Sequence, residues 1–288
     1  MKQTIEKSDQ RFRKTREKIA RFRPIDDTFF EKIAEDPEVC EELLQVILQE
    51  PELKVTEVIP QKSIRNLQGH SVRLDALCIR GDGHFCNVEI HRANDENSLK
   101  RVRYNASCIT ANIVDPGEKY ENVPDVSVVY ISEFDVFKLE RTIYHIEPTI
   151  VETRNTVDNG LHEIYVNTAI DDGSEISELM QCFLQTDVDN KKFPKFSKRV
   201  YYFKHDEEGV KDMCSISEEF REEGRKEGRE EGREEARQES ILEFLQDLGD
   251  IPKTLKDKIR EQSDIEVLKR WLKLAAKSDS IEAFTAQM

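Results

Sequence analysis

The chain of 288 residues lacks any run of about 18 apolar residues, the length that a membrane-spanning helix needs. Its first 25 residues are basic and polar, without the apolar segment of a secretory signal. The six cysteines are scattered and include no Cys-x-x-Cys pair, which favours reduced thiols over a disulfide framework. These absences argue against a secreted, fibrous or membrane-spanning protein and predict a cytoplasmic one.

Charge is abundant and unevenly distributed. Charged residues make up 36% of the chain, against roughly 25% in a typical globular protein, and the net charge is −15. Residues 1–25 run against this trend, with nine basic and three acidic side chains. A basic arm at residues 1–23 can anchor nucleic acid by neutralising phosphates, and a solvated terminal helix is the alternative interpretation.

The other end of the chain contains a four-residue repeat. Glu-Gly-Arg occurs at 223–225, 227–229 and 231–233. We expect one long charged helix at 212–248, followed by a small helical tail at 249–288. The row of glycines would let a second helix approach closely, which predicts a homodimer; a single solvated helix is the alternative. Light scattering of the chain with and without residues 212–288 distinguishes the two.

Residues 24–211 have the pattern of a mixed α/β domain. Asp36-Pro37 is typical of a helix start, and further helices are expected at 97–114 and around 174–184. The strand-like runs lie at 54–66, 72–80, 85–92, 126–131, 142–146 and 162–166. The run at 126–131 is almost continuously apolar, as expected for a strand covered on both faces. The order of these elements predicts a sheet flanked by helices.

Two carboxylates, Asp75 and Glu89, lie in strand-like runs on either side of a Gly-Asp-Gly turn at 81–83. Carboxylates are disfavoured in strands, and two neighbouring ones repel each other unless a cation lies between them. Mg²⁺ suits such a pair because it binds carboxylate, carbonyl and water oxygens. Because strand side chains alternate, His91 shares the face of Glu89. A metal site is one interpretation, and an exposed acid on a solvated face is the other.

Strand register decides whether the two carboxylates can meet. A two-residue turn at Asp82-Gly83 would place Asp75 opposite Ile90, so that Asp75 and Glu89 faced opposite sides of the sheet. A shared site therefore requires an odd-length loop or a bulge, which the glycines on both sides of Asp82 make easy. We expect that register, with the two carboxylates close enough to share one ion.

Other chemistries have weaker support. Cys78, His84, Cys86 and His91 are zinc-type ligands within one hairpin, but their spacing matches no familiar zinc pattern. No Gly-x-Ser-x-Gly elbow is present, which argues against a serine hydrolase. No Gly-x-x-x-x-Gly-Lys-[Ser/Thr] loop is present either, so we expect no nucleotide cofactor.

Several short motifs occur in a characteristic order. They are Ile25-Asp26-Asp27-Thr28-Phe29-Phe30, Leu74-Asp75, Asn87-Val88-Glu89-Ile90-His91-Arg92, Arg101-Val102-Arg103-Tyr104, Tyr144-His145-Ile146, Ile164-Tyr165-Val166-Asn167 and the Glu-Gly-Arg repeats. Together they resemble the PD-(D/E)XK nuclease superfamily, in its transposase and recombination-promoting nuclease branch. The resemblance extends over most of residues 24–215. It implies a restriction-endonuclease-like fold of the α/β (α+β) class, a mixed sheet flanked by helices.

The resemblance also implies a catalytic site. Asp75, Glu89 and the main-chain carbonyl of Ile90 would hold Mg²⁺ or Mn²⁺. His91 stands where the superfamily usually has Lys, or Gln in this branch, and would assist the attacking water or the phosphate. The implied reaction is metal-dependent hydrolysis of phosphodiester bonds in DNA.

The helix after the hairpin supplies candidate nucleic-acid contacts. Taking Leu99 and Val102 as part of its apolar stripe, we expect Arg103 to reach along the sheet edge toward the carboxylates or a phosphate. A salt bridge to an acid at the edge of the core is the alternative for Arg103, and Arg101 is expected on the surface. Tyr104 points outward, where it could stack on a base. With Arg92, the expected nucleic-acid contacts are therefore Arg92, Arg103 and Tyr104.

Two hypotheses about function follow from different classes. The first is a metal-dependent DNA endonuclease that acts in recombination or transposition, with Asp75, Glu89 and His91 as its catalytic residues. The second is a catalytically inert nuclease fold that serves as a binding or regulatory module. The histidine at position 91 is the feature on which they differ.

Overall fold

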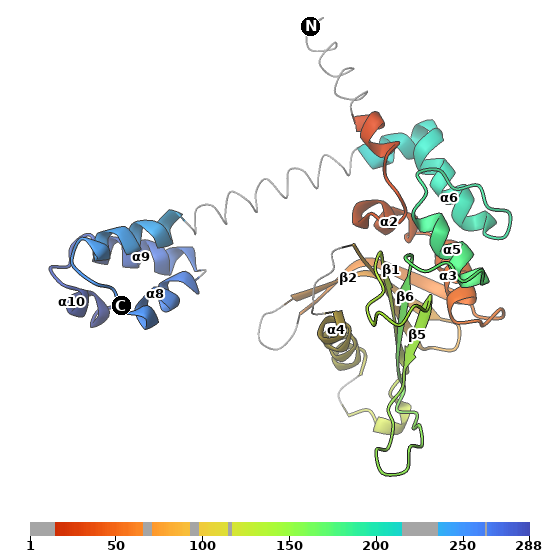
Figure 1. Cartoon of the computed structure of the whole chain (residues 1–288), viewed down its shortest axis with the longest axis horizontal. Helices are drawn as coiled ribbons and strands as arrows, with labels where there is room; N and C mark the ends of the chain where they lie inside the picture. The colour runs from red at the N-terminus through yellow and green to blue at the C-terminus, as the bar shows by residue number, and fades with distance from the viewer. Residues whose placement is uncertain (1–14, 66–70, 93–97, 115–116, 215–235, 263) are drawn as a thin grey trace, which may run out of the picture. The chain divides into compact units, whose positions relative to one another are not determined.

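The computed structural model describes residues 15–65, 71–92, 98–114, 117–214, 236–262 and 264–288. The chain divides into two compact units, Met1–Ser215 and Ile216–Met288 (Figure 1). Within the described ranges, no helix is both long enough and apolar enough to cross a membrane.

One six-stranded mixed sheet forms the centre of the first unit. Its strands are β1 (Val55–Arg65), β2 (Ser71–Arg80), β3 (Phe85–His91), β4 (Val126–Ser132), β5 (Ile143–Ile146) and β6 (Leu161–Asn167). Their order in the sheet is β1-β2-β3-β4-β6-β5. β2 is antiparallel to both of its neighbours, β1 and β3; β4 and β6 continue parallel to β3, and β5 is antiparallel to β6. The strand runs expected from the sequence are confirmed, and every residue of β4 is buried as predicted.

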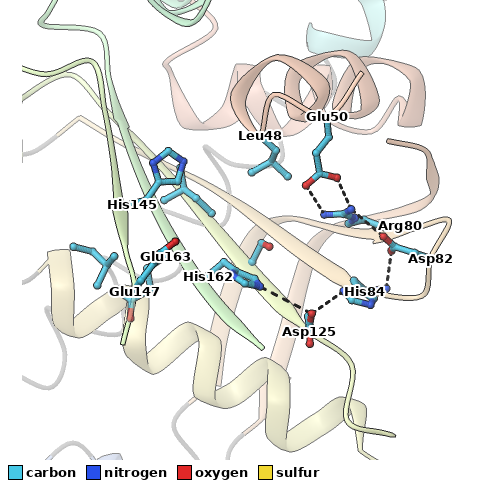
Figure 2. Close-up of a pocket in the computed structure, with 13 residues that line it drawn as sticks. Leu48, Glu50, Arg80, Asp82, His84, Asp125, His145, Glu147, His162 and Glu163 are labelled. Carbon is cyan, nitrogen blue, oxygen red and sulfur yellow. Dashed lines mark hydrogen bonds and ion pairs between the residues drawn. The ribbon is translucent and has the colours of Figure 1, made fainter. Parts of the chain in front are cut away.

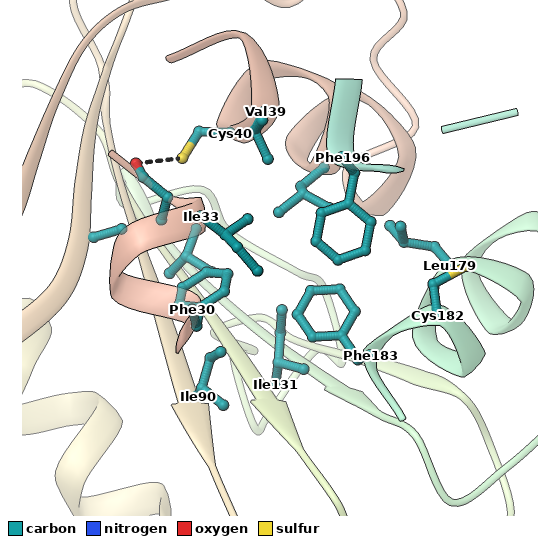
Figure 3. Close-up of a cluster of buried hydrophobic side chains, with 14 of the residues drawn as sticks. Phe30, Ile33, Val39, Cys40, Ile90, Ile131, Leu179, Cys182, Phe183 and Phe196 are labelled. Atoms are coloured by element: carbon teal, nitrogen blue, oxygen red, sulfur yellow. Dashed lines mark hydrogen bonds between the residues drawn. The ribbon is translucent and has the colours of Figure 1, made fainter. Parts of the chain in front are cut away.

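Four helices cover one face of the sheet. They are α2 (Asp27–Ile33), α3 (Pro37–Ile47), α5 (Glu175–Phe183) and α6 (Pro194–His205). Their apolar side chains form one large core with those of the sheet, in which Phe183 packs on Phe30 and Phe196 above Ile90 and Ile131 (Figure 3). This core holds α2 firmly against the strands that carry Asp75 and Glu89.

Within the part of the chain that the structure describes, α4 (Ser98–Ile113) is the one helix that covers the opposite face, and a short 3-10 turn (Tyr120–Asn122) follows it (Figure 1). The helix itself is confirmed, but its buried face differs from the expected one. Leu99 is 49% exposed, whereas the polar residues Ser98 and Asn105 are buried. The face directed at the sheet is therefore rotated toward Ser98, which changes the arginine that lies at its border.

The hairpin between β2 and β3 has the odd loop length that a shared carboxylate site requires. The Arg80 N–H donates to the His84 carbonyl over 2.9 Å, which leaves a loop of three residues, Gly81 to Gly83. Gly83 has a φ of +86°, in the left-handed region that glycine adopts without strain. The Asp82 carboxylate accepts a hydrogen bond from the His84 N–H over 3.1 Å and closes the turn. The paired residues are consequently Ile79 with Phe85 and Cys78 with Cys86.

Helix α6 was not anticipated from the sequence, and its start depends on a residue far away in the chain. Glu42 of α3 is buried, and its carboxylate accepts hydrogen bonds from the backbone N–H groups of Lys195 (3.2 Å) and Phe196 (2.8 Å). These N–H groups belong to the first turn of α6, where no intrahelical acceptor exists. Glu42 thus caps the N-terminus of α6 through a tertiary contact, a role that a local residue fills in other helices.

The second unit is a small helical assembly with its own core. Residues 236–246 are helical and are followed by α8 (Lys253–Arg260), α9 (Ile265–Ala275) and α10 (Ile281–Thr285). Their buried side chains include Ile241, Leu245, Ile259, Trp271 and Phe284. The expected short helices of the tail are confirmed. The Glu-Gly-Arg repeats lie outside the described residues, and self-association through them stays a prediction.

Candidate active site between strands β2 and β3

β2 and β3 separate from each other at the position of the two carboxylates. The strands are paired from Ile79 opposite Phe85 to Ala76 opposite Val88. Beyond that pair β2 continues beside β1, and β3 continues beside β4. Asp75 and Glu89 are the first residues after the last pair, so both lie at the mouth of the gap between the strands.

The side chains of strand β2 change from one face of the sheet to the other at Asp75. Leu74 packs in the cluster under α4, whereas Ala76 packs in the core on the opposite face. Residues two apart in a regular strand share a face, so the strand is irregular between them. Gln61, which stands opposite Asp75 in β1, has a φ of +49° and interrupts the ladder at the same place. This irregularity lets the Asp75 side chain reach toward β3.

The Asp75 carboxylate bonds directly to the backbone of β3. Its Oδ2 accepts a hydrogen bond from the Ile90 N–H over 2.9 Å. This N–H has no β2 backbone partner because the strands have already separated. Since the N–H and the carbonyl of one strand residue point to the same side, the Ile90 carbonyl also faces the gap. Asp75, Glu89 and this carbonyl thus border one space.

Glu89 is buried on β3, with only 1% of its surface exposed. Its Oε1 accepts a hydrogen bond from the side-chain amide of Asn87 over 2.7 Å. Its Oε2 is buried and has no hydrogen-bond partner among the described residues. A buried carboxylate oxygen without a donor is costly, and a bound cation would satisfy it.

Burial and neighbouring negative charge make both carboxylates harder to ionise. Burial and the charge of Asp27 raise the pKa of Asp75, whereas the Ile90 N–H, Arg101 and Arg73 lower it. Burial also raises the pKa of Glu89, and the charge of Asp75 raises it further, while Asn87, Arg101 and the backbone N–H of Asp75 lower it. The pair is therefore destabilising when fully ionised, unless a cation neutralises it.

A third carboxylate, Glu31 of α2, belongs to this neighbourhood and was missed by the sequence analysis. Glu31 is 8% exposed, accepts a hydrogen bond from Gln61, and lies 3.7 Å from the Arg73 guanidinium. Burial raises its pKa to about 7, and the charge of Asp75 contributes in the same direction. The available signal was its position four residues after Asp27, which places both acids on one face of a helix.

The arginine of α4 whose charge acts on both carboxylates is Arg101, which is exposed as expected, whereas a contact of Arg103 with a phosphate stays a prediction. Arg101 follows the buried Ser98 by three positions and precedes the buried Asn105 by four, so it borders the face that meets the sheet. Its charge lowers the pKa of both site carboxylates. Arg103 lies beside the exposed Leu99 and is itself exposed, as is Tyr104 on the same helix.

His91 and Arg92 end β3 next to the site. The half-buried His91 shares the face of Glu89, and its ring lies 5.7 Å from that of Tyr130. Arg92 forms ion pairs with Asp26 over 2.5 Å and with Glu133 over 3.3 Å. Two carboxylates therefore already engage Arg92, which leaves less of its charge for a phosphate than the sequence analysis assumed.

A separate polar cavity of about 340 Å³ lies at the other end of the same strands, around the hairpin turn (Figure 2). Several of its charged side chains are paired with one another. His84 lies 3.2 Å from the Asp125 carboxylate, and His162 lies 4.0 Å from the same oxygen. Arg80 is held between Glu50 at 2.6 Å and Asp82 at 2.9 Å. These ion pairs therefore link the ends of the strands.

The zinc alternative is ruled out by the same geometry. Cys78 and Cys86 face each other in the large core, where burial contributes to a raised pKa for both thiols. His84 lies with Asp125 in the polar cavity, and His91 lies at the far end of β3. The four side chains that share a hairpin in the sequence are thus distributed over three environments.

The donors between β2 and β3 suit a hard divalent cation. Among the described residues, no three His, Cys, Asp or Glu side chains form a group that could hold a metal ion. Two carboxylates and a main-chain carbonyl are nevertheless the kind of partial oxygen set with which Mg²⁺ is bound, since it keeps several waters and takes substrate oxygens. The unpartnered Glu89 Oε2 is the observation that supports the fit.

A mixed sheet flanked by helices, with two carboxylates where β2 and β3 separate, defines a PD-(D/E)XK nuclease fold. Comparison with known families agrees, because the model of the PD-(D/E)XK nuclease family transposases matches residues 29–241. The chain belongs to this family. No curated protein matched the chain, and no solved structure did. Nucleases of this kind generally use divalent metal ions, and their substrate is DNA.

The raised pKa of Glu31 predicts a pH-dependent stability. The pKa of Glu31 in the folded protein, about 7, lies above the ordinary value of 4.5. The stability that this raised pKa contributes is therefore fully present below about pH 4.5 and is lost as the pH rises to 7. We expect the free energy of unfolding of Glu31→Gln to rise by about 1–3 kcal/mol relative to that of wild type between pH 4.5 and 7, measured by urea unfolding without metal. Glu38→Gln, on the exposed side of α3, is the control. A stability difference that does not change with pH would contradict the prediction.

Proposed function

We propose that this protein is a metal-dependent DNA endonuclease that hydrolyses phosphodiester bonds in recombination or transposition. The observation that carries the proposal is the pair Asp75 and Glu89 at the gap between β2 and β3. A carboxylate oxygen without a donor and two carboxylates that resist ionisation are unfavourable for a purely structural site. They are understandable if the pair is completed by a cation when the enzyme works.

In this proposal Asp75, Glu89 and the Ile90 carbonyl hold Mg²⁺ or Mn²⁺. The bound ion would lower the pKa of a water and offset negative charge on the phosphate. Asp75 also bonds to the Ile90 N–H over 2.9 Å, which fixes the backbone of β3 relative to β2. Asp75 would therefore do two things: it would bind the ion, and it ties β3 to β2 where the strands separate.

Cations from two elements surround the carboxylates. Arg101 comes from α4 and Arg73 from β2, and both lower the pKa of Asp75. Their charges favour the ionised carboxylates that a metal requires and can attract a DNA phosphate to the same place. His91, on the face of Glu89, is assigned to positioning the attacking water or the phosphate.

Nicking of supercoiled plasmid DNA with Mg²⁺ or Mn²⁺ tests the proposal. We expect wild type to nick the plasmid, and Asp75→Asn or Glu89→Gln to lose at least about 100-fold in rate, because each removes a charged ligand. Glu163→Gln is a matched control on β6, where the carboxylate accepts a hydrogen bond from the Tyr165 hydroxyl. If the wild type nicks no DNA form with any divalent metal, the protein is an inert binding module instead.

The two arginines of α4 provide a second test with a built-in control. Arg101→Ala should lower the nicking rate about 10-fold, since it removes a charge that acts on both carboxylates. Arg103→Ala, two residues away on the exposed face, should cost less than about threefold. Rates measured over a series of Mg²⁺ concentrations check this. An equal loss for both variants would mean that α4 acts only as a general basic surface.

Substitution of His91 tests its assigned role. His91→Gln and His91→Lys introduce the residues usual at this position in the superfamily, and both should retain cleavage. His91→Ala should lower the rate about 10- to 100-fold, in the range expected for loss of a group that positions or activates water. Single-turnover rates at saturating metal are the measurement. If His91→Ala cleaves as fast as wild type, the histidine has no part in the reaction.

A further inference from the structure

Asn87 is an unusual residue for its position. It lies on the central strand β3 and is completely buried. Its neighbours across the two adjacent strands, Leu77 and Val128, both belong to the apolar cluster under α4. An amide buried among aliphatic side chains is unfavourable unless its polar atoms are bonded.

The hydrogen bonding of Asn87 is directed at one group. Its Nδ2 donates to the Glu89 Oε1 over 2.7 Å, and among the described residues its Oδ1 has no partner. Asn167, a buried asparagine at the end of β6, is used differently. Its amide donates to the carbonyls of Arg141 and Thr142, and its Oδ1 accepts from the Ile170 N–H. Asn167 therefore stabilises the backbone through its hydrogen bonds, whereas the hydrogen bond of Asn87 goes to a side-chain carboxylate.

We infer that Asn87 is a positioning residue that holds Glu89 by one oxygen and so reserves the other for the divalent cation. This inference rests on the proposed function. The bond is charge-assisted and joins two residues on the same face of one strand, so it restricts the rotation of the Glu89 carboxylate. Oε1 is occupied, and Oε2 is the atom left for a metal.

Stability and metal binding are expected to respond in opposite ways when Asn87 is replaced. A leucine of similar size would satisfy the aliphatic surroundings and remove the unpaired Oδ1, so the folded protein without metal should be no less stable. The same change removes the donor that holds Glu89. A merely structural role for Asn87 predicts the reverse, with lower stability and an unchanged site.

The experiment measures Mn²⁺ binding to the full chain by calorimetry without DNA, together with the thermal unfolding midpoint without metal. We expect Asn87→Leu and Asn87→Ala to raise the Kd for Mn²⁺ about 10- to 100-fold, the usual effect of removing a group that orients a metal ligand. The midpoint of Asn87→Leu should equal or exceed that of wild type. Asn87→Ala removes the same amide without adding bulk, so it shows whether an effect of leucine comes from overpacking.

Asn190→Leu is the matched control. The Asn190 amide donates to the carboxylate of Glu178 on α5 over 3.0 Å, so the same amide-to-carboxylate bond is removed where no site is assigned; the Asn190 Oδ1, unlike that of Asn87, accepts from the Lys192 N–H. Its Kd for Mn²⁺ should equal that of wild type. If wild type binds Mn²⁺ and a folded Asn87→Ala binds equally well, the role of Asn87 is refuted while the proposed function stands. If wild type neither binds Mn²⁺ nor nicks DNA, the proposed function itself fails.

Discussion

The separation of β2 from β3 is the constraint on which the site depends. If the two strands stayed paired beyond Ala76 and Val88, the Ile90 N–H and carbonyl would be used in the ladder. The separation leaves them available, and Asp75 accepts a hydrogen bond from the N–H across the gap. Each strand keeps its outer partner, β1 or β4, so the sheet remains continuous on both sides. The fold thus places polar groups between two of its strands without losing its core.

Burying the carboxylates at this position costs free energy. Asp75, Glu89 and Glu31 are poorly solvated, and burial raises the pKa of each. Arg73 and Arg101 compensate part of this cost from outside. The packing of α2, α3, α5 and α6 on one face supplies a large apolar core that can tolerate it. Sites that sacrifice stability in this way are typical of function, because apolar side chains would fold better.

Much of the fold could be predicted from local pattern. The continuous apolar run at 126–131 indicated a strand buried on both faces, and β4 is such a strand. The glycines around Asp82 indicated an odd loop, and the hairpin has one. Helix α6 could not be predicted, because its first turn is capped by Glu42 of α3, far away in the sequence. A capping interaction of this kind leaves no local signal.

By itself, the sequence indicated the strands, the odd hairpin loop that brings Asp75 and Glu89 to the same end of the β2–β3 pairing, and the family, since these depend on alternation, loop length and the spacing of motifs. Only the tertiary structure decided which other residues join the site. Arg101 borders the face of α4 that meets the sheet because polar Ser98 and Asn105 are buried while Leu99 is exposed, which a hydrophobicity pattern cannot reveal. Glu31 joins because the phenylalanine core docks α2 beside β2, and Asn87 matters because its surroundings are apolar. Burial and contact across elements arise only when the chain is folded.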